Sequence, residues 1–166
     1  MATKESKNFV RDSISRKAWS GPVIDLGAGI QAGDYAQFFP REKYIQLDAD
    51  KVACPTADIV ADILKMPEVK TASYGVVLML ETLEHLADPF QAFKEAARIL
   101  RVGGLFVCTT VAVWALHRHP KDYYRFLPDG LQYLCKASEL TPYFEMLDNP
   151  KADSACHCCI AAVKNA

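Results

Sequence analysis

Residues 23–30 (VIDLGAGI) constrain the fold of this chain more than any other stretch of the sequence. Val23–Leu26 suits a buried strand, and Gly27 and Gly29 allow the tight backbone turn that would follow it. A strand that runs directly into a glycine turn is typical of the first unit of a parallel α/β sheet, where the turn closes around part of a nucleotide. The remaining sequence indicates which nucleotide.

Strand-like and helix-like segments alternate along the chain. The expected strands are residues 23–26, 43–47, 58–60, 74–80, 105–111, 143–147 and 156–163. The expected helices are residues 5–19, 32–39 and 128–136, with one more that starts at Pro89 and ends before Gly103. This alternation predicts an α/β fold: a Rossmann-like, doubly wound, mostly parallel seven-stranded sheet with helices on both faces.

The two most central elements have the clearest signals. Residues 74–80 (YGVVLML) are apolar on both faces, as a central parallel strand should be. The next helix begins with Asp88 at the cap and Pro89 in the first turn, which are favoured residues at those positions. Its expected buried face consists of Phe90, Phe93, Ala97 and Leu100.

The length of 166 residues predicts a single domain over residues 1–166, in which residues 1–19 form an N-terminal helix that could act as a lid. The formal net charge of −1 gives no global attraction to nucleic acid or anionic membranes. No apolar run approaches the roughly 20 residues needed to span a bilayer, and the first residues lack an apolar signal segment. We therefore expect a cytoplasmic protein with no membrane span.

Six cysteines fit a reducing compartment, in which a domain of this size needs no disulfides. The stretch CHCCIAAV, which begins at Cys156, has no second cysteine pair elsewhere to complete a structural metal site. It predicts a terminal strand that carries small buried thiols.

The glycine turn alone leaves a nicotinamide dinucleotide open as the ligand. Residues 27–32 satisfy the G-x-G-x-x-G/A pattern, and Asp48 follows about 20 residues later, where a ribose acceptor belongs. Asp25 favours another ligand, because a carboxylate there would repel a pyrophosphate and attract the cationic end of an amino acid. Asp62 could accept a hydrogen bond from an adenine amine, and the chain is too short for a separate substrate domain.

Five stretches in this order carry a family resemblance: VIDLGAGI, YIQLDAD, ADIVADI, VVLMLETLEHLADP and ARILRVGGLFVCTT. Together they resemble the class I S-adenosylmethionine-dependent methyltransferases, and within them the small-molecule (type 11) group that includes the ubiquinone and menaquinone methyltransferases. The resemblance covers about residues 20–137 and implies S-adenosyl-L-methionine as the cofactor.

The resemblance also assigns cofactor-binding residues by position. They are Asp25, Gly27, Ala28, Gly29, Asp48, Ala49, Asp62, Ile63, Leu80 and Glu81. Asp25, Gly27 and Gly29 would line the methionine part, Asp48 would take the ribose hydroxyls, and Ala49 would lie beside the adenine. Asp62 and Ile63 would bracket the adenine, while the last two would lie near the sulfonium. One position departs from the family, because its third glycine is Gln31 here.

His85 is the first candidate catalytic base. With Glu81 and Glu84 it forms an E-x-x-E-H stretch that could group three side chains near the sulfonium. The stretch is similar to the metal-binding segment of some small-RNA 2′-O-methyltransferases and of ubiquinone O-methyltransferases, in which case His117 or His119 could supply a further ligand. A base, a metal ligand and a structural role therefore remain open for His85, and no residue is assigned to a metal.

Residues 117–126 (HRHPKDYYRF) form the second candidate region, with His117 as the second catalytic candidate. Cationic groups and tyrosines would suit an anionic or glycosyl acceptor, and a solvated loop is the alternative. The stretch resembles a segment of methyltransferases associated with cell-surface glycan biosynthesis. The (N/D)-P-P-(Y/F) stretch typical of enzymes that methylate exocyclic base amines is absent, so DNA is not an expected partner.

We therefore expect a methyltransferase (EC 2.1.1.-) that acts on an oxygen or nitrogen atom of a small molecule related to a glycan or a quinone. Two alternatives stay open: a non-catalytic module that binds the cofactor or a partner, and a domain that binds NAD. A second subunit could complete the pocket, which would make the protein a homodimer.

Overall fold

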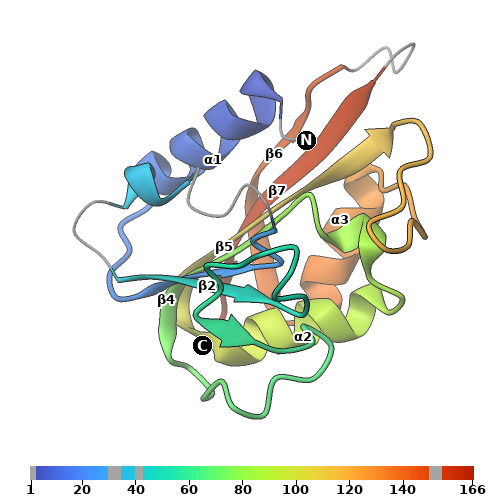
Figure 1. Ribbon diagram of the computed structural model, residues 1–166. Coiled ribbons are helices and arrows are strands. Elements are labelled where there is room, and N and C mark those ends of the chain that lie inside the picture. Colours follow the sequence, from blue (N-terminus) through green and yellow to red (C-terminus); the bar gives the residue numbers. More distant parts are fainter. Residues whose placement is uncertain (1–2, 30–34, 40–42, 150–154) are drawn as a thin grey trace.

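The computed structural model describes residues 3–29, 35–39, 43–149 and 155–166 (Figure 1). Its strands are β1 (Val23–Leu26), β2 (Tyr44–Asp48), β3 (Ile59–Val60), β4 (Tyr74–Leu80), β5 (Leu100–Val113), β6 (Leu140–Leu147) and β7 (Cys156–Lys164). Its α-helices are α1 (Lys4–Arg16), α2 (Pro89–Ile99) and α3 (Pro128–Ala137), and its 3-10 helices are η1 (Ala36–Phe38) and η2 (Leu83–His85).

Within the described residues, the strands form one seven-stranded sheet in the order β3-β2-β1-β4-β5-β7-β6. The four neighbouring pairs from β3 to β5 are parallel, and β7 runs antiparallel to both β5 and β6. The predicted mostly parallel, doubly wound sheet is therefore confirmed. The strand order reverses beside β1 and β4, which is where ligands bind in open α/β sheets.

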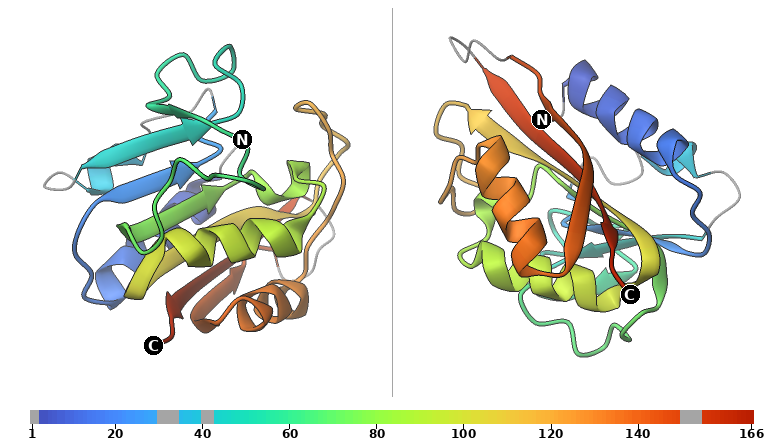
Figure 2. Two further views of the ribbon diagram at one scale, coloured as in Figure 1. Left: turned by 90° about the horizontal axis from the view of Figure 1, so that it is seen from below. Right: turned by 180° about the vertical axis from the view of Figure 1, so that it is seen from behind.

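Helices cover both faces of the sheet, as predicted: α1 lies on one face, and α2 and α3 lie on the other (Figures 1 and 2). The alternation of side chains along β4 supplies both cores. Val77 and Met79 belong to the buried cluster that contains residues of α2 and α3, whereas Val76 and Leu78 belong to the cluster that contains residues of α1.

The predicted start of α2 is confirmed, but its predicted buried face needs a correction. Asp88 caps the helix by accepting a hydrogen bond from the Gln91 backbone N–H at 2.9 Å. Phe93 is fully buried, but Phe90 is 41% exposed and packs edge-on against Tyr133 of α3. The helix ends at Ile99, so Leu100 is buried as the first residue of β5, and the small Ala92 and Ala96 bring the helix close to the sheet.

The N-terminal helix is shorter than residues 5–19, because it ends at Arg16. Its Phe9 ring stacks on Phe144 of β6 with 4.7 Å between ring centroids, and Tyr143 donates a hydrogen bond to the Ser13 carbonyl. These contacts dock α1 on the sheet, and its action as a lid stays a prediction. Of the helix predicted over residues 32–39, residues 32–34 lie outside the described residues, and Ala36–Phe38 form only the short 3-10 helix η1.

The terminal strand predicted from CHCCIAAV is confirmed as β7. All six cysteines lie in the described part of the chain, and each is a buried free thiol. Burial raises the pKa of the Cys158 thiol to about 12, which favours an unreactive, packed role.

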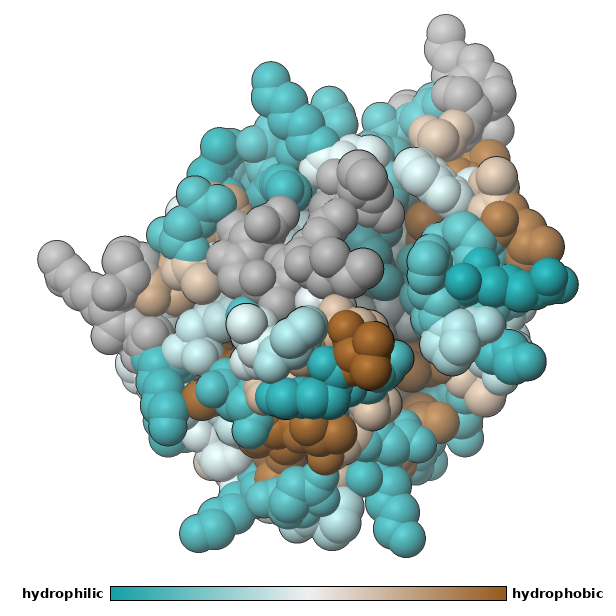
Figure 3. Space-filling model, in the orientation of Figure 1, coloured by the Kyte–Doolittle hydropathy of each residue, from teal (hydrophilic) through white to brown (hydrophobic). Residues whose placement is uncertain are grey.

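Charged and polar side chains cover much of the face shown in Figure 3, with apolar side chains gathered in smaller areas between them. In the parts of the chain that the structure describes, no helix has the length and apolar character needed to cross a membrane.

Candidate active site

One cavity of about 630 Å³ lies at the carboxyl ends of the central strands, a size typical of small-molecule sites. Its lining includes all twelve residues predicted from the sequence: Asp25, Gly27, Ala28, Gly29, Asp48, Ala49, Asp62, Ile63, Leu80, Glu81, His85 and His117. The cavity is also lined by Arg118, His119 and Pro120 of the second candidate region. Five further lining residues were not singled out from the sequence: Tyr35, Asp50, Ala53, Thr82 and Leu86. The candidate residues therefore share one hollow, although they come from separate strands and loops.

The glycine turn after β1 forms one wall of the cavity. Gly27 and Gly29 have φ values of 75° and 58°, which glycine adopts without steric cost. A Cβ atom on Gly27 would lie only 2.4 Å from the Thr82 side chain, so a larger residue would clash with it. The Asp48 carboxylate accepts a hydrogen bond from the Gly29 N–H at 2.9 Å and thereby ties the turn to the end of β2. Gln31, the departure from the family pattern, lies outside the described residues.

Asp25 of β1 carries a buried carboxyl group in this wall, with 3% of the residue exposed. Burial raises its pKa to about 6, against the lowering effect of the hydrogen bond that the Tyr44 hydroxyl donates at 2.7 Å, and the charge of Asp48 adds to the rise. A buried carboxyl with a raised pKa is most favourably ionised beside a cation. The site therefore suits a ligand that brings a positive charge to Asp25.

The other two strand-end acids also hold their own turns. Asp48 accepts from the Asp50 N–H at 2.8 Å, and Asp62 accepts from the Leu64 N–H at 2.9 Å. Each carboxylate oxygen has two lone pairs, so these backbone bonds leave acceptor capacity facing the cavity. Both acids line the cavity while they cap their turns, so the structural and the ligand-binding interpretations are compatible.

The opposite wall consists of η2 and the segment of residues 114–127, which follows β5. His85 Nδ1 lies 2.5 Å from the Lys121 carbonyl oxygen, and His117 Nδ1 lies 3.2 Å from the Ala115 carbonyl oxygen. Carbonyl oxygens only accept hydrogen bonds, so both Nδ1 atoms carry the proton. In the neutral rings, each Nε2 atom is left with a free lone pair for proton transfer.

Glu84 lies between these two imidazoles and is fully buried. Thr110 donates to its Oε2 at 2.7 Å, but its Oε1 has no hydrogen-bond partner in the described residues and lies 3.9 Å from His85 Nε2 and 3.7 Å from His117 Nε2. Burial, followed by the charge of Glu81, raises the pKa of Glu84. The three ligand atoms lie within 4.8 Å of one another, so this set could hold a divalent ion.

Glu81 does not join that set, although the E-x-x-E-H pattern groups it there. Its side chain contacts Thr109 of β5 at 2.7 Å and His157 of β7 at 3.0 Å. The sequence reasoning missed His157 because it stands in an apolar strand, where the only signal was a lone imidazole among thiols.

The segment of residues 114–127 is held to the fold by ionic and backbone contacts. Asp122 pairs with Arg125 and accepts from the His117 backbone N–H at 2.9 Å. The Arg125 guanidinium is the largest of the effects that hold the pKa of Asp122 well below its usual range. Tyr123 N–H donates to the Glu84 carbonyl at 2.8 Å, so the segment is anchored to η2 although most of its residues are exposed to solvent, as in the loop alternative.

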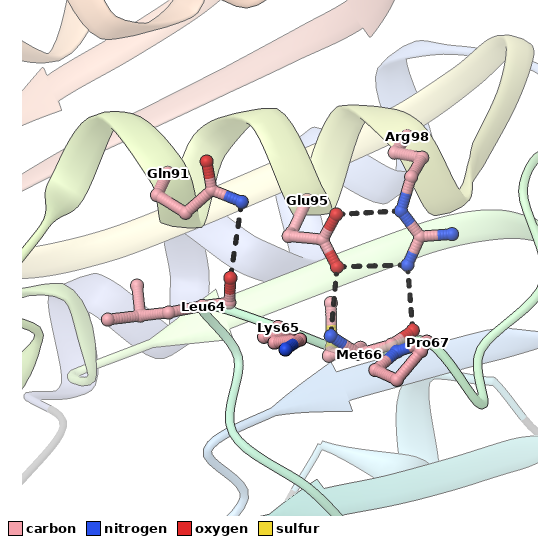
Figure 4. A pocket seen from close by; sticks show the side chains of 7 residues that line it. All are labelled: Leu64, Lys65, Met66, Pro67, Gln91, Glu95 and Arg98. Atoms are coloured by element: carbon pink, nitrogen blue, oxygen red, sulfur yellow. Dashed lines mark hydrogen bonds and ion pairs between the residues drawn. The ribbon is translucent and has the colours of Figure 1, made fainter.

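A second, smaller cavity of about 190 Å³ lies between α2 and residues 64–67 (Figure 4). Glu95 and Arg98, both on α2, form a two-point ion pair beside it, with N–O distances of 2.7 and 2.9 Å. Arg98 also donates to the carbonyls of Met66 and Val69, and Glu95 accepts from the Met66 N–H. Both charged groups thus bond to this chain, which indicates a structural clamp.

Comparison with known proteins identifies the family. A family model described as "Methyltransferase domain" matches residues 24–108, from β1 to the middle of β5. The chain belongs to the class I S-adenosylmethionine-dependent methyltransferases. Its methyl donor is therefore S-adenosyl-L-methionine, as the resemblance implied, and a domain that binds NAD is not supported.

The ubiquinone biosynthesis O-methyltransferase of Maricaulis maris is 27% identical over 118 residues, which cover 63% of this chain and 46% of that protein. The chain spans about half the length of the curated relatives it matches. Among solved structures, the geranyl diphosphate C-methyltransferase of Streptomyces coelicolor has a TM-score of 0.75 at 15% identity, covering 96% of this chain and 77% of that one. A Haemonchus contortus phosphoethanolamine N-methyltransferase has a TM-score of 0.76 at 14% identity, covering 96% of this chain and 52% of that one. At these identities, the structural matches show the shared fold.

Proposed function

We propose that this chain transfers a methyl group from S-adenosylmethionine to an oxygen or nitrogen atom of a small-molecule acceptor. One observation carries the proposal: the strand-end carboxylates and the paired histidines line the same cavity from opposite walls. Transfer requires the donor and the acceptor to meet in line, and positioning of this kind supplies roughly 7–11 kcal/mol in favourable cases. A cavity with two chemically different walls suits that task.

The first wall fits the cofactor. When bound, S-adenosylmethionine supplies a methyl group on a positively charged sulfur. The buried Asp25 would bind its ammonium group, Asp48 would accept from the ribose hydroxyls, and Asp62 would accept from the adenine amine. The turn at Gly27 and Gly29 would let the backbone approach the methionine part, because no side chain projects there.

The second wall would receive the acceptor. His85 Nε2 and His117 Nε2 would take the proton that the acceptor's O–H or N–H group loses as the new bond forms. Arg118 and His119 line the same wall and would favour an acceptor with negative charge. Quinone-related and glycan-related acceptors both fit these requirements, and the names of the ubiquinone-pathway relatives favour the first.

Labelled cofactor provides the test of activity. Tritium from methyl-labelled S-adenosylmethionine should appear in a small molecule of a cell extract when the protein is added, and His85→Ala should abolish most of the transfer. Binding of the cofactor without any transfer would instead support the non-catalytic alternative. In a thermal-shift series, S-adenosylhomocysteine at 100 times its dissociation constant should stabilise the fold by about 2.7 kcal/mol.

The cofactor wall is tested separately with Asp48→Ala. This variant should bind S-adenosylhomocysteine more weakly and still fold, because a ribose acceptor is lost from a half-exposed site. Asp58→Ala is the matched control, since Asp58 accepts from the Gln46 N–H but does not line the cavity. An unchanged affinity in Asp48→Ala would remove Asp48 from the site.

A further inference from the structure

A fully buried histidine on β7 links the cavity to the antiparallel edge of the sheet. The His157 Nε2 atom lies 3.0 Å from Glu81 Oε2, and its Nδ1 atom lies 3.0 Å from Asp148 Oδ2. Its backbone N–H also donates to Asp148 Oδ1 at 2.7 Å. We refer to these three residues as the Glu81–His157–Asp148 triad.

The geometry of the Glu81–His157–Asp148 triad favours a protonated imidazole. Each ring nitrogen faces a carboxylate oxygen, and carboxylate oxygens accept hydrogen bonds without donating them. With both carboxylates ionised, the two contacts are both attractive only when both ring nitrogens carry a proton, which makes His157 an imidazolium. Burial by itself lowers the pKa of His157, but the hydrogen bonds and charges of Glu81 and Asp148 outweigh burial and raise it.

The other neighbours of the Glu81–His157–Asp148 triad do not oppose the positive charge on His157. The Trp114 ring packs beside His157 with centroids 5.2 Å apart, and Thr3 at the cap of α1 donates to Asp148 Oδ2 at 3.3 Å. In the described residues, Glu81 Oε2 and His157 Nε2 make no hydrogen bond, and the 3.0 Å ion-pair contact with each other is the interaction that they share. The contact between them is therefore the one that holds this side of the ring.

Glu81 is the residue of the Glu81–His157–Asp148 triad that lines the cavity. Its backbone has a φ of 53°, a left-handed conformation that is uncommon for a residue with a side chain, and its N–H donates to the Thr109 carbonyl at 2.8 Å. Thr109 Oγ1 donates a hydrogen bond to Oε1 at 2.7 Å, and Oε2 has the ion-pair contact with His157. Glu81 follows β4, between the β1 turn of the cofactor wall and the Glu84–His85 stretch of the acceptor wall.

We propose that His157 is a positioning residue, which holds the Glu81 carboxylate at the junction of the two walls, and that the charge of Glu81 favours the positively charged methyl donor over the neutral demethylated product. The inference rests on the proposed function, because the transferred methyl group must lie where the walls meet. It assigns a role in the release of S-adenosylhomocysteine to a histidine that does not line the cavity.

Two non-reacting ligands test the inference without an acceptor. Sinefungin carries an ammonium group in place of the sulfonium, whereas S-adenosylhomocysteine is neutral at sulfur. Calorimetric titration gives the ratio of the two dissociation constants. Loss of one charge-assisted contact in Glu81→Gln should weaken sinefungin binding about tenfold relative to S-adenosylhomocysteine. His157→Gln should change the ratio by a similar factor, and the double variant should add little, because both act through one carboxylate.

Cys158→Ala is the matched control on the same strand, since it removes buried packing beside His157 without altering a charge. It should lower the melting temperature and leave the ligand ratio unchanged. Should His157→Gln fail to fold, the ring nitrogens of wild-type His157 decide the matter: ¹⁵N NMR at neutral pH should show both protonated. A neutral His157 ring, or an unchanged ratio in Glu81→Gln, would overturn the inference. A wild-type protein that binds neither ligand would contradict the proposed function itself.

Discussion

The Glu95–Arg98 clamp at α2 and the cluster of Glu84, His85 and His117 in the cavity both pair a glutamate with nitrogen groups. They differ in how many of their polar atoms have hydrogen-bond partners. In the clamp, both oxygens of Glu95 are bonded, and the Arg98 guanidinium has further bonds to backbone carbonyls. In the cavity, Glu84 Oε1 has no hydrogen bond in the described residues and faces two imidazole Nε2 atoms.

Completed bonding stabilises a fold, whereas a buried oxygen without a partner costs free energy. The cluster of Glu84, His85 and His117 therefore does not contribute to stability in the way that the clamp does. Groups left in this state are available to a proton or a ligand, and strained or unsatisfied groups are concentrated at functional sites. The comparison predicts that variants of the two clusters will affect different properties.

The largest effect is expected for the histidines of the cavity. His85→Ala should reduce methyl transfer by roughly 10²–10⁴-fold, the usual contribution of a general base, with little change in melting temperature. Radiolabel transfer and a thermal melt measure the two properties. His119→Ala, on the same wall but without a contact to Glu84, should lose much less activity. Equal losses in both variants would mean that His85 only shapes the wall.

The clamp should show the opposite pattern. Arg98→Ala should lower the free energy of unfolding by about 2–3 kcal/mol, because it removes the two-point ion pair with Glu95 and the hydrogen bonds to the Met66 and Val69 carbonyls. Urea denaturation measures this loss, and titration with S-adenosylhomocysteine should find the affinity retained. Arg11→Ala, which breaks the exposed pair with Asp12, should cost under about 0.5 kcal/mol. If Arg98→Ala weakened cofactor binding without lowering the free energy of unfolding, the proposed difference between the two regions would be wrong.

Cofactor affinity should depend on pH through Asp25. Only the ionised carboxylate attracts the ammonium group, and its pKa of about 6 means that protonation begins near neutrality. The dissociation constant should therefore rise as the pH falls below 6, by about tenfold per pH unit. Asp25→Asn should bind weakly at every pH and lose this dependence. A wild-type affinity that stayed constant between pH 7 and pH 5 would show that Asp25 does not contact the cationic group.

The smallest effect is expected for Glu84→Gln. The amide can still accept the bond from Thr110, so the packing is kept. Because the folded state raises the pKa of Glu84, the folded protein binds more protons than the unfolded chain, and stability falls as the pH rises above the group's ordinary value of 4.5. Glu84→Gln should lack this fall and be relatively more stable at high pH. Parallel pH profiles of the two melting temperatures would contradict the raised pKa.

The order of elements and the positions of the cofactor acids could be predicted from local signals. The strands of the parallel half are short segments rich in apolar residues. Asp48, Asp62 and Glu81 stand at or just after the ends of such segments, and Asp25 lies within the first one. The carboxyl ends of neighbouring parallel strands meet at one edge, so residues with this placement converge whatever the intervening loops do. The error at Phe90 has a local cause as well: helical spacing alone does not show that Ala92 and Ala96 pack against the sheet.

The sequence by itself therefore determined the α/β architecture, the family and the strand-end residues that meet at the cavity. Only the tertiary structure separated Glu81 from Glu84, which look equivalent in E-x-x-E-H but bond to different strands. It also brought His157 to Glu81 from a strand 76 positions further along the chain. The physical reason is that such pairings depend on the insertion of β7 antiparallel beside β5, and a contact between distant strands has no periodic signature in the sequence.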